Sequence, residues 1–150
     1  MIPPDRTVVS RVIVRAPNWL GDAVMALPAM VALRRHFAAA RLVVAAPAGV
    51  APLFALDTGV APDEVLTVER AHRAAIAQLQ RTQADLIVLL PNSFRTAWQA
   101  HRAGIPQRWG YAISARGWLL TRRARRVRPG RRDAGRAPQH HVDYYRDLVR

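Results

Sequence analysis

Polar side chains follow two apolar segments of the sequence at the same relative position. Pro17-Asn18 comes directly after the segment 11–16, and Pro91-Asn92 comes directly after the segment 85–90. The polar residues of these turns and of the helix starts behind them are Asn18, Asp22, Asn92, Ser93 and Arg95. If the two strands are neighbours in a parallel sheet, these side chains meet at the carboxyl ends of the strands, where such sheets bind ligands. Helix capping is the alternative for Asn92 and Ser93, because both are good N-caps.

Asp22 has the residue type and the position of a general base. Gly21 gives the chain freedom to turn, and Asp22 is then expected to open a helix. The helix dipole stabilises a carboxylate in a first turn, so we expect Asp22 to be ionised at neutral pH. A general base must be ionised and must face the crevice. A purely structural role is the alternative, because acidic residues are common at helix starts.

The basic residues are all arginines and are unevenly distributed. The chain has 150 residues, 23 Lys+Arg, 10 Asp+Glu and a formal charge of +13. No acidic residue occurs between Leu86 and Arg132, where the arginines are Arg95, Arg102, Arg108, Arg116, Arg122, Arg123, Arg125, Arg126, Arg128, Arg131 and Arg132. Such a block predicts an anionic partner, which could be nucleic acid, a phosphorylated small molecule or an anionic membrane surface. A solvated basic face without a partner is the alternative.

Several chemistries are excluded or unsupported by the composition. Cysteine is absent, which excludes disulfides, thiolate metal sites and a cysteine nucleophile. Neither GxGxxG nor a GxxxxGKS or GxxxxGKT loop is present, and no His and carboxylate spacing predicts a metal site. The tryptophans in or near the loops and the basic half are Trp19, Trp98, Trp109 and Trp118. They could stack on a sugar or lie against lipid, although core packing is the simpler explanation for at least two of them.

The apolar pattern predicts an α/β fold in which strands alternate with helices. We expect strands at 11–16, 41–46, 64–68, 85–90 and 108–111, and helices at 22–37, 50–56, 70–82 and 93–103. The strands are continuously apolar, as in a parallel sheet with helices on both faces. Pro28 should kink or restart the first helix, because it removes the hydrogen bond to the Val24 carbonyl. The stretch 122–138 is rich in Arg, Gly and Pro and predicts a loop, followed by a helix at 140–149.

The length and the N-terminus favour one domain made and kept inside the cell. A chain of 150 residues can form a single core. The N-terminus has two prolines and an aspartate before any apolar run, unlike a secretory signal. The longest uncharged stretch, 42–56, is shorter than the roughly 20 residues that a membrane-spanning helix needs.

Two long strings of the sequence resemble a known enzyme family. VRAPNWLGDAVMALPAMVALRR and DLIVLLPNSFRTAWQAHRAGIPQRWGY, followed by RGWLLT and HHVDYYRDL, resemble the ADP-heptose:lipopolysaccharide heptosyltransferases of glycosyltransferase family nine, heptosyltransferase II type. The resemblance implies a GT-B enzyme with two Rossmann-like domains facing a cleft. Residues 1–150 would be the N-terminal, acceptor-binding domain, and the C-terminal nucleotide-sugar-binding domain would be absent. The chain alone would therefore be inactive.

The resemblance also implies a reaction and its participants. The family transfers heptose from ADP-heptose, with inversion, to the inner core of lipopolysaccharide. The acceptor here would be a heptosyl-Kdo-lipid A, and Asp22 would be the catalytic base. No metal and no cofactor would be needed.

The predicted arginine chemistry suits such an acceptor. Guanidinium groups bind phosphates and carboxylates in bidentate fashion, and Arg95 is the best single candidate because it follows the Pro-Asn-Ser turn. The other predicted substrate contacts are Asn18, Gly21, Asn92, Ser93, Arg116, Arg122 and Arg123. We expect a cytoplasmic protein, peripheral at the inner leaflet of the inner membrane, and no nucleic-acid partner. A non-catalytic basic module that binds anionic glycolipid, membrane surface or nucleic acid is the alternative.

Overall fold

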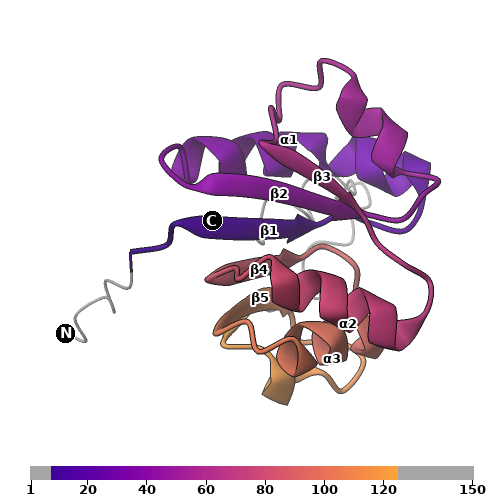
Figure 1. The fold of residues 1–150 in the computed structure, drawn as a ribbon, viewed down its shortest axis with the longest axis vertical. Helices are drawn as coiled ribbons and strands as arrows, with labels where there is room; N and C mark the ends of the chain where they lie inside the picture. The colour runs from indigo at the N-terminus through magenta and orange to yellow at the C-terminus, as the bar shows by residue number, and fades with distance from the viewer. Residues whose placement is uncertain (1–7, 125–150) are drawn as a thin grey trace, which may run out of the picture.

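A single parallel sheet organises the protein. The computed structural model describes residues 8–124, and its six strands lie in the order β3-β2-β1-β4-β5-β6 (Figure 1). The strands are β1 (Arg11–Arg15), β2 (Arg41–Ala46), β3 (Glu64–Thr67), β4 (Leu86–Leu89), β5 (Gln107–Tyr111) and β6 (Arg122–Ala124). The helices are α1 (Leu20–His36), α2 (His72–Arg81) and α3 (Phe94–Arg102), with short 3-10 turns η1 (Ala51–Ala55) and η2 (Gly117–Leu119). The predicted α/β class and the parallel sheet are confirmed.

The central strands are buried on both faces, which explains their continuous apolar sequence. Val12 and Val14 of β1 pack into one cluster with Met30 and Leu33 of α1. Ile13, between them, packs into a second cluster that includes Ala97 of α3. Because successive strand residues point to opposite faces, α1 covers one side of the sheet while α2 and α3 cover the other. The helices therefore pack on the two faces of the sheet.

Helix α1 starts earlier than predicted and passes through its proline without a break. It begins at Leu20, two residues before Asp22, and its N-cap residue Trp19 makes no side-chain capping bond. Pro28 is exposed on the solvent side, and the helix continues to His36. The expected restart at Pro28 is therefore wrong. Burial of the opposite, alanine-rich face offsets the hydrogen bond that proline removes.

The edge strand β6 was not predicted from the sequence. It pairs in parallel with β5, with Trp109 opposite Arg122. Two arginines and an alanine carry no strand signal, so tertiary contacts must place them. The Thr121 N–H donates to the Arg108 carbonyl oxygen at 2.8 Å, and the Arg122 guanidinium carbon lies 4.5 Å from the Trp109 ring centroid. The expected loop is thus wrong for 122–124, whereas 125–138 and the helix expected at 140–149 lie outside the described residues.

Candidate functional site

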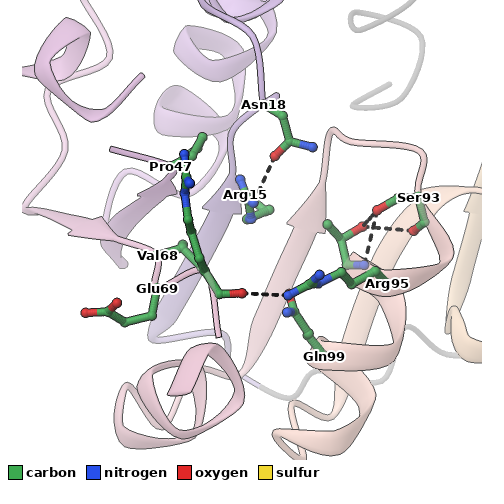
Figure 2. Close-up of a pocket in the computed structure, with 10 residues that line it drawn as sticks. Arg15, Asn18, Pro47, Val68, Glu69, Ser93, Arg95 and Gln99 are labelled. Carbon is green, nitrogen blue, oxygen red and sulfur yellow. Dashed lines mark hydrogen bonds between the residues drawn. The ribbon is translucent and has the colours of Figure 1, made fainter. Parts of the chain in front are cut away.

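A pocket of about 390 Å³ lies at the carboxyl ends of the central strands (Figure 2). Its volume falls within the range of small-molecule sites, roughly 300–1,000 Å³. The lining residues are Arg15, Asn18, Pro47, Val68, Glu69, Arg70, Ser93, Arg95, Thr96 and Gln99. The structure therefore brings together Asn18, Ser93 and Arg95, three of the residues expected there. It adds Arg15, Arg70, Thr96 and Gln99, which the sequence did not single out.

Arg15, the last residue of β1, is a buried cation in this pocket. Arg15 is only 7% exposed. Nη1 donates to the Ala16 carbonyl oxygen at 2.7 Å, and Nη2 donates to Asn18 Oδ1 at 3.0 Å. Desolvation by burial lowers the pKa of Arg15 to about 10. The guanidinium therefore still carries its charge at neutral pH, in a place where water no longer solvates it well.

Ser93 both caps α3 and lines the pocket. Its hydroxyl oxygen accepts a hydrogen bond from the Thr96 N–H at 3.3 Å, and the Thr96 hydroxyl donates to the Ser93 carbonyl oxygen at 3.0 Å. The capping alternative is thus confirmed for Ser93, and it does not exclude contact with a ligand. Asn92 is half-buried and does not line the pocket.

Arg95 of α3 connects this helix to the segment that follows β3 at the rim of the pocket. Its exposed guanidinium donates from Nη2 to the Arg70 carbonyl oxygen at 2.7 Å (Figure 2). Gln99, one helical turn further on, lies 3.2 Å from His72 Nδ1 through its side-chain nitrogen. These contacts fix the segment after β3 against α3. Among the described residues, Arg95 forms no ion pair with a carboxylate.

Asp22 lies in the first turn of α1, as expected, but outside the pocket lining. Its side chain is half-buried and makes no hydrogen bond or ion pair with any residue of the range 8–124. Gly21 is helical rather than turned, and a Cβ added there would meet no atom within 4 Å. The structure therefore assigns no special backbone conformation to Gly21, contrary to our expectation. Apart from its chain neighbours, the glycine has open space around it.

Arg116 is inside the protein rather than on its binding surface. It is fully buried, at 0% exposure. Nη1 donates to the carbonyl oxygens of Pro91 at 2.7 Å and Ser93 at 3.1 Å, and Nε donates to the Tyr111 carbonyl oxygen at 2.9 Å. We expected an exposed acceptor contact. The observed geometry is that of a structural cation that joins the turn before α3 to the end of β5.

Arg122 and Arg123 lie on the edge strand β6, away from the pocket. Both are exposed, and neither lines the pocket. The structure thus separates these two arginines from Arg95, which sequence reasoning had grouped with them. Contact with substrate remains a prediction for both.

The tryptophans divide between the core and the surface. Trp98 and Trp109 are half-buried and pack against the two core clusters, whereas Trp19 and Trp118 are exposed. Trp98 and Trp118 form an aromatic cluster with Phe94 and His101 on the outer side of α3, with ring centroids 5.9–6.3 Å apart. We call this set the α3 aromatic cluster. Its outer members expose apolar area next to Arg102, which lies 6.0 Å from the Trp98 ring centroid.

The described part of the chain has neither a cluster of metal-ligating side chains nor a membrane-spanning helix. Residues 8–124 contain no group of three or more His, Cys, Asp or Glu side chains that could hold a metal ion. None of the helices in this range has the length and hydropathy needed to cross a membrane.

The sheet order and the position of the pocket define the class of the domain. The order β3-β2-β1-β4-β5-β6 is that of a Rossmann-like fold, whose ligands bind where the strand order reverses, here between β1 and β4. Escherichia coli ADP-heptose lipopolysaccharide heptosyltransferase II shares this fold, with a TM-score of 0.71 and 28% identity over 93% of this chain and 40% of that one. A glycosyltransferase family 9 protein of Veillonella parvula matches with a TM-score of 0.71 at 17% identity, again over 93% of this chain and 40% of that one.

Sequence comparison points the same way. Lipooligosaccharide heptosyltransferase 2 of Haemophilus ducreyi is 30% identical over 117 residues, which are 73% of this chain and 33% of the relative. Lipopolysaccharide heptosyltransferase 2 of E. coli K12 is 30% identical over 118 residues, with the same coverage of 73% and 33%. No protein-family model matches the sequence. The chain is similar to the heptosyltransferases of glycosyltransferase family 9, and it spans about a third of the length of these curated relatives.

Proposed function

We propose that this chain is the N-terminal, acceptor-binding half of an inverting heptosyltransferase. The enzyme transfers heptose from ADP-heptose to the inner core of lipopolysaccharide, with heptosyl-Kdo-lipid A as the acceptor. The observation that carries the proposal is the pocket between β1 and β4, lined by three arginines and one carboxylate. An acceptor that bears phosphates and carboxylates complements this charge. The names of the two heptosyltransferase 2 relatives support the substrate class.

Asp22 is the proposed base of the reaction. Its carboxylate takes the proton from the acceptor hydroxyl as the hydroxyl oxygen attacks the anomeric carbon of the heptose. The bond from that carbon to the ADP oxygen breaks at the same time, so ADP leaves with the bonding electrons and the configuration inverts. The freedom of the Asp22 side chain from hydrogen bonds within residues 8–124 supports this role, because a base tied to a structural partner would have to be released first.

Donor binding belongs, in this proposal, to a second domain. Residues 1–150 account for acceptor binding, and a C-terminal domain outside residues 1–150 would hold ADP-heptose. Because the acceptor is anchored by its lipid, we place the enzyme at the cytoplasmic face of the inner membrane as a peripheral protein.

A second candidate function is a non-catalytic module that binds an anionic lipid surface. The α3 aromatic cluster favours it, because Phe94 is 41% and Trp118 is 61% exposed beside the cation of Arg102. Aromatic and basic side chains together are typical of residues at a membrane surface. The two functions share a partner and differ in whether the pocket recognises the sugar.

A lipid-binding titration separates these possibilities. The chain is titrated with vesicles containing Kdo-lipid A, with anionic phospholipid vesicles of equal charge, and with duplex DNA, each at two salt concentrations. The acceptor proposal expects preference for the Kdo-lipid A vesicles that persists at the higher salt. Equal binding to both vesicle types supports the lipid-surface module, and DNA binding with a steep salt dependence contradicts both.

A further inference from the structure

The carboxylates that pair with arginines in the described residues lie at the amino ends of the strands, away from the pocket. The ion pairs that the structure describes within residues 8–124, Arg34–Asp63 at 2.9 Å and Arg41–Glu64 at 3.1 Å, lie near the amino ends of β2 and β3. Asp85 is also at that end, just before β4, where it accepts hydrogen bonds from Ser10 and Arg11. At the carboxyl ends, the pocket has three arginines and Glu69 as its acidic residue. Figure 2 shows the Glu69 side chain directed away from Arg15.

Arg15 is the least solvated charge of this pocket, and its internal partners do not neutralise it. Its two hydrogen-bond acceptors within residues 8–124, Ala16 O and Asn18 Oδ1, are both neutral. A guanidinium has five N–H donors, so these two bonds leave further donors for another group. Burying a charge without a counter-charge is unfavourable, and structures retain such a group where a ligand or a partner supplies the opposite charge.

A second buried arginine shows what a purely structural role looks like in this protein. Arg116 is fully buried and donates to three carbonyl oxygens and, at 3.4 Å, to the Thr96 hydroxyl. It does not line the pocket. Arg15 differs in two respects: it has only two hydrogen-bond acceptors within residues 8–124, and it lines the pocket. The contrast separates a cation that holds the fold from a cation that is placed to receive a ligand.

We propose that Arg15, Asn18 and Arg95 form an oxyanion subsite that binds one negatively charged group, a phosphate or a carboxylate, of the acceptor. The proposal rests on the proposed function and assigns Arg15 as the anchor of that site. Asn18 Oδ1 accepts from Arg15, which turns the Asn18 amide N–H₂, a donor, toward a bound anion. Arg95, on the opposite side of the pocket, supplies a second positive charge from α3. Figure 2 shows Arg15 near the middle of the lining residues, with Asn18 above it and Arg95 to its right.

The subsite is tested first by titrating the chain with inorganic phosphate, with Kdo monosaccharide and with mannose. Phosphate and Kdo represent the two sources of an oxyanion, and mannose is the neutral control. NMR follows the Nε–H signal of Arg15 directly, so this test does not depend on a variant that folds. We expect a saturable shift of that signal with at least one anion and none with mannose. An unmoved Arg15 signal, or a shift that does not saturate with either anion, overturns the subsite.

Substitutions then assign the binding energy. R15Q removes the charge and keeps a polar amide with two N–H donors on a shorter side chain, and we expect it to weaken binding of the preferred anion about tenfold or more. R15K keeps the charge and should lose less. R41Q is the matched control, because Arg41 is an exposed arginine at the opposite end of the sheet and should bind like the wild type. Equal weakening by R15Q and R41Q contradicts a local site.

The vesicle titration distinguishes failure of the subsite from failure of the proposed function. If the wild type and R15Q bind Kdo-lipid A vesicles equally well, the subsite is wrong and acceptor binding still stands. If the wild type shows no preference for these vesicles, the acceptor function is wrong as well. A loss of preference in R15Q, with R41Q unchanged, supports both.

Discussion

The guanidinium of Arg116 donates a hydrogen bond of 2.7 Å to the carbonyl oxygen of Pro91. Pro91 follows β4 and belongs to the Pro-Asn turn that leads into α3, whereas Arg116 follows β5. The bond therefore holds the turn before α3 against the segment after β5. Arg116, which does not itself line the pocket, in this way helps to position Ser93 and Thr96, which do.

Replacement of Arg116, which does not line the pocket, by Met should destabilise the fold. The carbonyl oxygens of Pro91, Ser93 and Tyr111 would lose a charged donor, and we expect a loss of about 3 kcal/mol or more in the free energy of unfolding. Urea denaturation followed by circular dichroism measures it. R123M, on the exposed edge strand, is the control and should change stability by less than about 0.5 kcal/mol. Similar values for the two variants would contradict the structural role of Arg116.

Asp22→Ala should remove most of the transfer rate in an enzyme that also has the donor domain. Loss of a general base typically costs about 10²–10⁴-fold in rate, and ADP-heptose affinity should survive because Asp22 does not hold the donor in this proposal. Initial rates and donor binding are measured on the same preparation. Near-normal turnover of the variant would show that Asp22 is not the base.

Arg95→Ala should raise the acceptor KM more than the donor KM. Arg95 lines the pocket, and its other contact is a single hydrogen bond to the Arg70 carbonyl oxygen. Steady-state kinetics with each substrate varied in turn gives the two constants. Arg102→Ala, at the end of the same helix but outside the pocket lining, serves as the control. Equal changes in both KM values would mean that Arg95 only supports the fold.

Gly21→Ala separates the needs of the fold from the needs of the site. The helix has room for a methyl group there, and alanine is favoured over glycine in helices by up to about 1 kcal/mol. The variant should therefore be as stable as the wild type or more stable, as a thermal melt will show. Because Gly21 directly precedes the proposed base Asp22, a methyl group there should crowd the acceptor, and we expect the acceptor KM to rise. A wild-type KM in a stabilised protein would show that no substrate approaches this glycine.

Acid should destabilise the protein partly through Asp85. Desolvation, the largest influence, raises the pKa of Asp85, but hydrogen bonds from Arg11 and Ser10 outweigh it and lower the pKa below 3.8. Because the folded value is the lower one, the carboxylate stabilises the fold above the unfolded pKa, and this contribution is lost as the pH falls through the folded pKa. Urea midpoints measured from about pH 6 to pH 2 should fall less steeply for D85N than for the wild type. Parallel curves would contradict this assignment.

Strands and helices were predicted well from the sequence where they are buried in the core. The apolar runs in β1, β2 and β4 and the helical spacing between them were sufficient, because each strand is buried on both faces. Strand β6 was missed, since its position depends on Arg108 and Trp109 rather than on its own residues. The hydrophobic periodicity of a sequence cannot predict a strand that forms because of contacts with a neighbouring strand.

The site was predicted only where residues directly follow β1 and β4. Asn18, Ser93 and Arg95 were found in this way, but Arg15 was not, because an arginine at a strand end is usually exposed. The available signal was a charged residue inside the apolar run RVIVRA immediately before the Pro-Asn turn. Arg116 was predicted to contact substrate because arginines are usually exposed, but it is buried. Its burial depends on carbonyl oxygens contributed by turns that are distant in sequence.

The distribution of charge along the strands has a consequence for how an acceptor reaches the pocket. Within residues 8–124, Asp63 and Glu64 pair with arginines near the amino ends of β2 and β3, whereas three arginines and one carboxylate line the pocket. A cleft lined mostly by one sign of charge raises the local concentration of oppositely charged ligands, and this attraction acts over about a Debye length, roughly 8 Å at physiological salt. Added salt should therefore slow the arrival of an anionic acceptor at the pocket.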